Sequence, residues 1–224
     1  MTAAAMVQPE RSGIVRPFAS RVVRQEWAGR AVMPMVDAAD QVERPPGAGV
    51  PAAAYEESPR ALFVYRMRSG SDDHVGVVAD VRLDAFVNGG VRGHESVEPD
   101  RVEALVHHYT EVPVRSELVA LLHAPRPAAT RQVADACSGR PLLHIVGPDG
   151  LEHTVWRVAI EHEAAALAEA LGHGLQYIAD GHHRVAARLR VWEREGRPAG
   201  SGVLCVLFPM EGLRLSAFHR RVTG

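Results

Sequence analysis

Runs of apolar residues along the chain predict strands joined by short polar turns. Residues 61–67 (ALFVYRM) and 74–83 (HVGVVADVRL) are two such runs, and RSGSDD between them supplies turn residues. An antiparallel hairpin is the simplest prediction for this pair. Similar runs predict further strands at residues 117–124, 141–147, 151–160, 175–180 and 202–210, and a last hairpin that ends in 213–222.

Other segments carry apolar residues at helical spacing or signals that begin and end a helix. Val102 and Val106 belong to an apolar stripe that follows a proline and two acids, as is typical of a helix start. Pro127 fits the first turn of a second helix and Gly139 its end. The predicted helices cover residues 101–109, 126–139, 161–174 and 182–196.

The order of these elements predicts an α+β fold with a mixed α/β sheet. Hairpins alternate with strand–helix units, and there is no internal repeat or heptad pattern. Residues 36–59 are rich in Pro, Ala, Gly and acids, so we expect a loop or linker there. Residues 1–15 are predicted to be a disordered tail, and 16–224 a single domain.

Composition narrows the classes of function. The formal net charge of −2 gives no general attraction to nucleic acid or anionic membrane, and no apolar run is long enough to span a bilayer. We therefore expect a cytoplasmic protein with no nucleic-acid or membrane partner, while a homodimer stays open. Two cysteines, Cys137 and Cys205, are too few for a disulfide framework or a cysteine-based zinc site.

The segment YIADGHHRVAA (177–187) is the strongest candidate for a site. A strand is predicted to end at Asp180, Gly181 to form a tight turn, and a helix to begin at once. The start of a helix offers unpaired N–H groups and the positive end of its dipole. His182, His183 and Arg184 add three potential cations there, which predicts that an anion such as phosphate binds among them.

Asp180 carries the opposite charge at the same place. In a phosphate site such a carboxylate holds a metal ion or orients a hydroxyl, although a plain helix N-cap explains this residue alone equally well. Zinc held by His182 and His183 is disfavoured, because adjacent histidines diverge and lack the spacing that places two ligands on one helical face.

A second group of polar residues is GHES (93–96). Glu95 beside His94 could act as a general base on a substrate hydroxyl if the fold brings it to the phosphate loop, and His94 and Ser96 could contact that substrate. A surface pair or a helix cap is the alternative. His219 and Arg220 near the end of the chain could also bind an anionic substrate, or could be exposed residues of a frayed tail.

These motifs together resemble a known family. Residues 14–222 resemble uncharacterised bacterial and archaeal proteins that carry an HE[ST] motif, a YIADGHHR motif and a late HR pair. Members are commonly longer, so the chain looks like their N-terminal half. The DGHHR loop also resembles that of the free serine kinases of the ParB and sulfiredoxin superfamily, which implies a ParB/sulfiredoxin-like core with an additional N-terminal mixed β region.

The resemblance to these kinases implies a role for each motif. Glu95 falls at the position of their catalytic glutamate, although this chain has Gly93 where the kinases have proline. The loop residues Asp180 to Arg184 fall where the kinases hold nucleotide phosphates and metal. We therefore expect phosphoryl transfer from ATP or ADP, with Mg²⁺ at Asp180, to free serine or a similar hydroxy amino acid, with Glu95, Asp180 and His183 as catalytic residues.

Other functions fit parts of the sequence. ParB relatives bind CTP on this fold, so a regulatory nucleotide-binding module without phosphoryl transfer is the main alternative. A phosphatase that acts on the same phosphorylated amino acid could use the same residues. A sulfiredoxin-like reductase is disfavoured, since it needs a reactive cysteine where this loop has His182 and His183.

Overall fold

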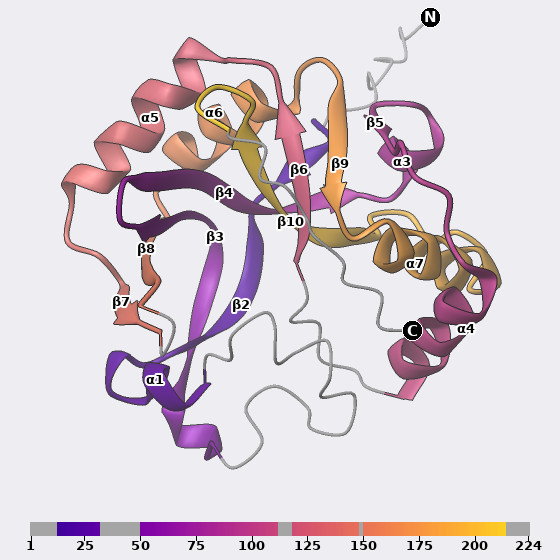
Figure 1. Cartoon of the computed structure of the whole chain (residues 1–224), viewed down its shortest axis with the longest axis horizontal. Helices are drawn as coiled ribbons and strands as arrows, with labels where there is room; N and C mark the ends of the chain where they lie inside the picture. Colours follow the sequence, from indigo (N-terminus) through magenta and orange to yellow (C-terminus); the bar gives the residue numbers. More distant parts are fainter. Residues whose placement is uncertain (1–12, 32–49, 112–117, 148–149, 214–224) are drawn as a thin grey trace, which may run out of the picture.

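The computed structural model describes residues 13–31, 50–111, 118–147 and 150–213 (Figure 1). Their strands are β1 (Val15–Arg16), β2 (Phe18–Val23), β3 (Tyr55–Ser69), β4 (Asp72–Arg82), β5 (Val91–Arg92), β6 (Val119–His123), β7 (Leu143–Val146), β8 (Glu152–Val158), β9 (Gln176–Asp180) and β10 (Gly202–Pro209). Their helices are α1 (Ala28–Ala31), α3 (Asp84–Val87), α4 (Pro99–Glu111), α5 (Pro127–Ser138), α6 (Glu161–Gly172) and α7 (His182–Arg194), with short 3₁₀ turns at Gln25–Trp27 and Ala52–Ala54. None of these helices is long and apolar enough to cross a membrane.

A single mixed sheet organises these elements. Its strand order is β5-β9-β6-β10-β4-β3-β8-β7, with β1 beside β4 and β2 beside β3. Most neighbours are antiparallel, whereas β10 runs parallel to β6 and β5 runs parallel to β9. The predicted α+β class with a mixed sheet is therefore confirmed.

The hairpin of β3 and β4 forms as predicted, but β3 begins earlier than expected. Residues 55–59, predicted as part of a loop, are strand and pair with β2, so that part of the prediction was wrong. Pro59 is tolerated because it lies opposite the register shift between Phe18 and Ser20, where the ladder is already interrupted. The acids that suggested a loop, Glu56 and Glu57, instead belong to this strand, where Glu56 is half-buried and Glu57 is exposed.

The main core lies between the sheet and the helices α5 and α6, which contact β3 and β8 (Figure 1). Leu62 and Val64 of β3, Trp156 of β8, and Leu167 and Leu171 of α6 are among its buried residues. Removing such a side chain from water stabilises the fold by about 1.5–3 kcal/mol each. Both helices agree with the sequence prediction, including Gly139 as the residue that follows α5.

A smaller core joins α4 to α7 beyond the edge of the sheet. Val102 and Val106 of α4 pack on Ala187 and Val191 of α7, and all four are buried. The apolar stripe predicted around Val102 and Val106 therefore faces α7. This packing fixes the segment that precedes α4 against the beginning of α7.

The strand β5 was not predicted, and it determines where the GHES segment lies. Only two residues long, it pairs in parallel with β9 through Val91 opposite Gln176 and Arg92 opposite Tyr177. Gly93 follows directly after this strand, just as the DGHHR loop follows β9. Because parallel neighbours end at the same side of a sheet, the two motifs are brought together.

Three expectations concern the N-terminal segment, the C-terminal hairpin and the predicted linker. Val15, which the sequence placed in a tail, belongs to β1 and pairs with Val81 of β4. The predicted hairpin through residues 213–222 falls almost wholly outside the described residues, as do 36–49 of the predicted linker.

Candidate functional site

The DGHHR segment forms the predicted strand–turn–helix. β9 ends at Asp180, Gly181 adopts φ 100° and ψ 24°, and α7 begins at His182. This left-handed backbone conformation favours glycine, so the residue type follows from the sharp turn. The N–H of Val185 donates to the Gly181 carbonyl at 2.9 Å, which closes the first helical turn.

The N-terminus of α7 is open to an anion. Gly181 is the N-cap residue, and no described side chain caps the helix, so the alternative in which Asp180 is the cap does not hold in this structure. The N–H groups that precede Val185 have no carbonyl partner within a helix. They are the groups that an anion can accept hydrogen bonds from, with help from the helix dipole.

His182 is buried and joins the loop to the GHES segment. Its Nε2 accepts the backbone N–H of His94 at 3.3 Å, and its Nδ1 lies 3.4 Å from Glu95 Oε2. The ring also meets the His94 ring edge-on, with centroids 4.6 Å apart. A backbone N–H can only donate, so Nε2 is unprotonated and the imidazole proton is on Nδ1, directed at Glu95.

The pKa of His182 is lowered. Burial is the main cause and His94 the next, while Glu95 and Asp180 act in the opposite direction without cancelling these effects. His182 is therefore neutral at neutral pH, in agreement with its role as an acceptor.

His183 makes a parallel contact. Its Nε2 accepts the backbone N–H of Glu98 at 3.0 Å, just before α4 begins. Both histidines of the loop therefore use Nε2 as an acceptor for a backbone N–H of the same short segment. The two imidazoles thus act as hydrogen-bond acceptors here, and not as the cationic phosphate ligands expected from the sequence.

Arg184 is held by the protein. Its guanidinium donates to the Asp180 carboxylate and to the Leu118 carbonyl. The side chain of Asp180 is nevertheless 61% exposed, and that of Glu95 is 63% exposed. Two accessible carboxylates therefore lie near the open N-terminus of α7, one on each of the two motifs.

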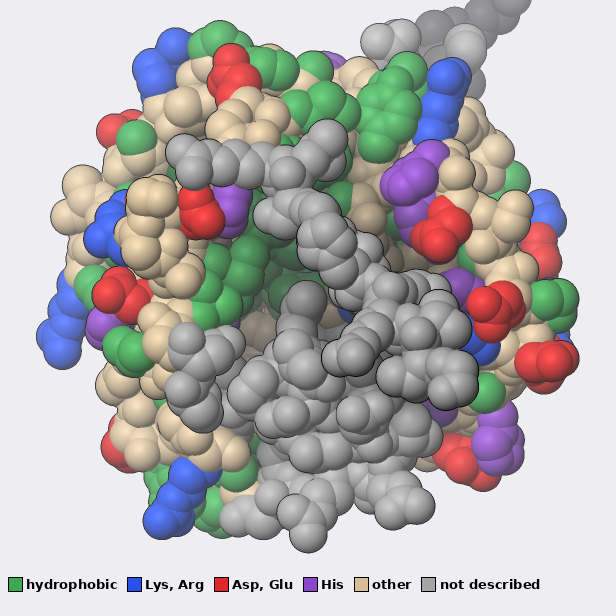
Figure 2. All heavy atoms as spheres, viewed as in Figure 1, with side chains coloured by type: hydrophobic (Ala, Val, Ile, Leu, Met, Phe, Trp, Pro, Cys, Tyr) green, Lys and Arg blue, Asp and Glu red, His purple; other side chains and the backbone are tan. Residues whose placement is uncertain are grey.

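The space-filling view agrees with this arrangement. Histidine and acidic side chains gather on the part of the surface where Figure 1 places α4 and α7 (Figure 2). Within the described ranges, no group of three or more His, Cys, Asp or Glu side chains could hold a metal ion alone. Mg²⁺ commonly takes one or two carboxylates together with substrate phosphates and water, and Asp180 fits that mode of binding.

Most of the site residues predicted from the sequence meet here. His94, Glu95, His182 and His183 are in direct contact with one another or with the same segment, and Ser96 is exposed within it. His219 and Arg220 lie outside the described residues.

Backbone groups and one glycine were missed by the sequence reasoning. The Glu98 N–H and the Leu118 carbonyl are partners of loop side chains, and backbone groups leave no signal in residue types. Gly93 was noted only as a departure from proline. A Cβ atom at this position would lie 3.1 Å from His182 Cδ2, so a small residue before the HE pair was the available signal.

A family model with the description "Protein of unknown function (DUF1015)" matches residues 54–224. No curated protein and no solved structure matches the chain. The matched range includes the GHES segment, the DGHHR loop and the whole of the sheet except β1 and β2.

Proposed function

The chain belongs to the DUF1015 family, and we propose that it is a kinase that transfers a phosphoryl group from a nucleotide to the hydroxyl of free serine or a similar small amino acid. The observation that carries this proposal is the placement of Glu95 beside the uncapped N-terminus of α7. A candidate base and a candidate phosphate site come from motifs about 85 residues apart and meet in the fold.

Phosphoryl transfer suits this arrangement because it depends mainly on positioning and on stabilising negative charge. The first N–H groups of α7 can bind phosphoryl oxygens, and the αL turn at Gly181 lets a phosphate approach the backbone closely. Asp180 is the residue that would hold Mg²⁺, which when bound to the nucleotide neutralises charge on the phosphate oxygens.

Glu95 supplies the base in this mechanism. Its exposed carboxylate accepts the proton of the substrate hydroxyl as the hydroxyl oxygen forms a bond to the terminal phosphorus. The bond from that phosphorus to the bridging oxygen breaks, and the shortened nucleotide leaves with the bonding electron pair. Transfer from ATP gives ADP, and transfer from ADP gives AMP.

Arg184 has a supporting role in this proposal. Because its guanidinium donates to Asp180 and to Leu118, it orients the candidate metal ligand and anchors the start of β6. The N–H groups of the helix thus replace the side-chain cations that the sequence suggested for binding phosphate.

The test is a direct search for product. The protein is incubated with Mg²⁺, with each of ATP, ADP and CTP, and with a panel of hydroxy amino acids, and products are identified by mass spectrometry. A phosphorylated amino acid formed only in the presence of protein and Mg²⁺ supports the kinase. Nucleotide binding without product for any pair would instead favour a regulatory nucleotide-binding module.

A further inference from the structure

We propose that His182 and His183 act as positioning residues that hold Glu95 in place, and that neither binds phosphate through its side chain. We call the two imidazoles, with the backbone N–H groups of His94 and Glu98 that they accept, the histidine clasp. The assignment of Glu95 as the base that the clasp serves rests on the proposed function, whereas the clasp itself rests on the hydrogen bonds.

The spacing of the donors explains why two adjacent histidines are needed. Successive side chains on an α-helix diverge by about 100°, so His182 and His183 cannot point at one ligand. They instead reach two N–H groups four residues apart in a segment without regular structure. Backbone N–H groups in such a segment have no ladder partner, and the imidazoles supply the acceptors.

The hydrogen bonds also fix the position of the protons. An Nε2 atom that accepts a backbone N–H carries no proton and cannot donate to a phosphate oxygen. The remaining proton of His182 is on Nδ1, where it faces Glu95 Oε2 at 3.4 Å. One buried imidazole therefore holds the backbone of residue 94 and directs the carboxylate of residue 95.

Gly93 lets the clasp close. The imidazole of His182 approaches the Gly93 backbone so closely that a Cβ atom would lie 3.1 Å from Cδ2 and 3.5 Å from Nε2. A larger residue at this position therefore requires the ring or the segment to shift by a few tenths of an ångström. The parallel pairing of β5 with β9 also brings residue 93, which follows β5, close to the beginning of α7.

Nuclear magnetic resonance of the full chain tests the clasp without any assay of activity. In the wild-type protein we expect His182 and His183 to be neutral Nδ1–H tautomers, which long-range ¹⁵N spectra of the imidazoles distinguish. We expect His182→Ala to speed hydrogen exchange at the His94 amide at least tenfold, and His183→Ala to do the same at the Glu98 amide. Nε2–H tautomers, or exchange rates that do not change, would overturn the proposal.

Matched variants separate the clasp from a general loss of structure. His182→Gln keeps an acceptor near the position of Nε2 and is expected to restore protection of the His94 amide, whereas His182→Asn is too short to do so. His173→Ala, on the exposed end of α6, is the control and should leave both amides unchanged. If the glutamine and asparagine variants behave alike, Nε2 is not the acceptor and the proposal fails.

Kinetics then link the clasp to Glu95. If the protein phosphorylates an amino acid, His182→Ala should lower kcat at least tenfold while changing KM for the nucleotide less than threefold, and His182→Gln should recover part of kcat. A rise in the nucleotide KM with kcat preserved would show that His182 binds phosphate. If the protein has no kinase activity but shows the expected tautomers and amide exchange, the proposed kinase function is wrong and the histidine clasp stands.

Discussion

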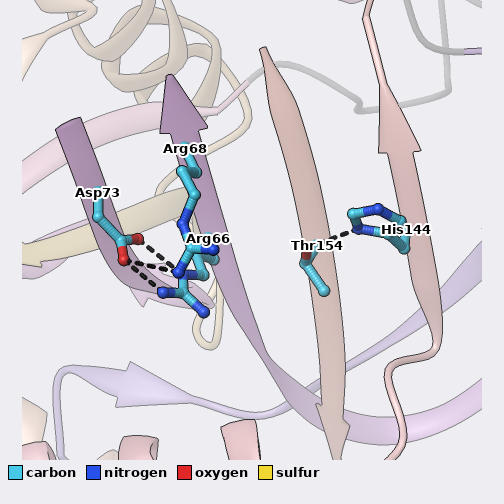
Figure 3. A network of polar contacts seen from close by, with 5 residues as sticks. All are labelled: Arg66, Arg68, Asp73, His144 and Thr154. Atoms are coloured by element: carbon cyan, nitrogen blue, oxygen red, sulfur yellow. Dashed lines mark hydrogen bonds and ion pairs between the residues drawn. The ribbon is translucent and has the colours of Figure 1, made fainter. Parts of the chain in front are cut away.

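Two polar clusters in different parts of the sheet are built on opposite principles. The histidine clasp joins segments 85–88 residues apart in the chain, through neutral imidazoles that accept backbone N–H groups. The other cluster, which we call the arginine network, consists of Arg66 and Arg68 of β3 around Asp73 of β4, near the His144–Thr154 pair of β7 and β8 (Figure 3). The ion pairs of this network and the His144–Thr154 contact beside it join residues five to ten positions apart on adjacent strands.

The two clusters differ in how much the protein depends on each polar contact. Charges in the arginine network are partly exposed, so water can replace each partner if one is removed. In the clasp, His182 is buried, and its removal leaves a backbone N–H without an acceptor. Similar numbers of hydrogen bonds thus have different consequences for stability and for any reaction at Glu95.

The largest difference expected between substitutions in the two regions is in kcat. Glu95→Gln keeps the size of the side chain but removes the base, so kcat should fall by roughly 10²–10⁴-fold if the chain is a kinase. Asp73→Asn, the matched carboxylate change in the arginine network, should leave kcat within about twofold of the wild-type value. Steady-state rates of product formation compare the two variants. Equal losses in both would show that Glu95 has no special role.

The next largest effect is on the free energy of unfolding. His182→Ala removes a buried ring and the acceptor for the His94 N–H, which should destabilise the fold by about 1–3 kcal/mol. His144→Ala removes one exposed imidazole and its 3.0 Å contact with Thr154, and should cost less than about 0.5 kcal/mol. Urea unfolding measures both. The contrast disappears if His144→Ala is the more destabilising change.

The strands around the arginine network, β3, β4, β7 and β8, were mostly predicted from the sequence. Each hairpin there joins two apolar runs through a short polar loop, so the strands themselves were predictable from local pattern, whereas their register comes from the structure. Residues 55–59 were the exception, because their partner β2 is distant in the chain and their own composition indicates a loop.

The residues of the candidate site could be predicted from the sequence, but the contacts between them could not. The αL turn at Gly181 and the helix after it follow from the sequence, as does the choice of Glu95 as a candidate base. Their contact depends on β5, a strand of two residues that is too short to leave an apolar pattern. The acceptor role of the two histidines depends on backbone donors, which residue types do not reveal, so counting side-chain charges predicted cations instead.

The pH dependence of stability is a third way to sharpen the comparison. Burial, and then His94, lowers the pKa of His182, and burial also lowers that of His123 at the far end of β6. The unfolded chain takes up protons on these residues near pH 6.5, before the folded chain does. Stability should therefore fall as the pH drops below about 6.5, and rise again toward pH 7.

Unfolding free energies measured at about pH 5.5 and about pH 7.5 check this sign. His182→Gln should reduce the difference between the two pH values, and the remaining difference should shrink again in the double variant with His123→Gln. A difference that stays the same in His182→Gln would mean that this imidazole takes up its proton equally in both states.

The smallest expected effect is in the arginine network, and it should respond to salt. Asp73 is the shared partner of Arg66 and Arg68, and their side chains are 29% and 43% exposed. Asp73→Asn should therefore cost at most about 1 kcal/mol at low ionic strength, and less at about 1 M salt, where the screening length is near 3 Å. His182→Ala should cost the same at both salt concentrations, because the hydrogen bond that it removes joins a neutral acceptor to a backbone N–H. If salt weakens both effects equally, the clasp is held by charge and the distinction between the two clusters is lost.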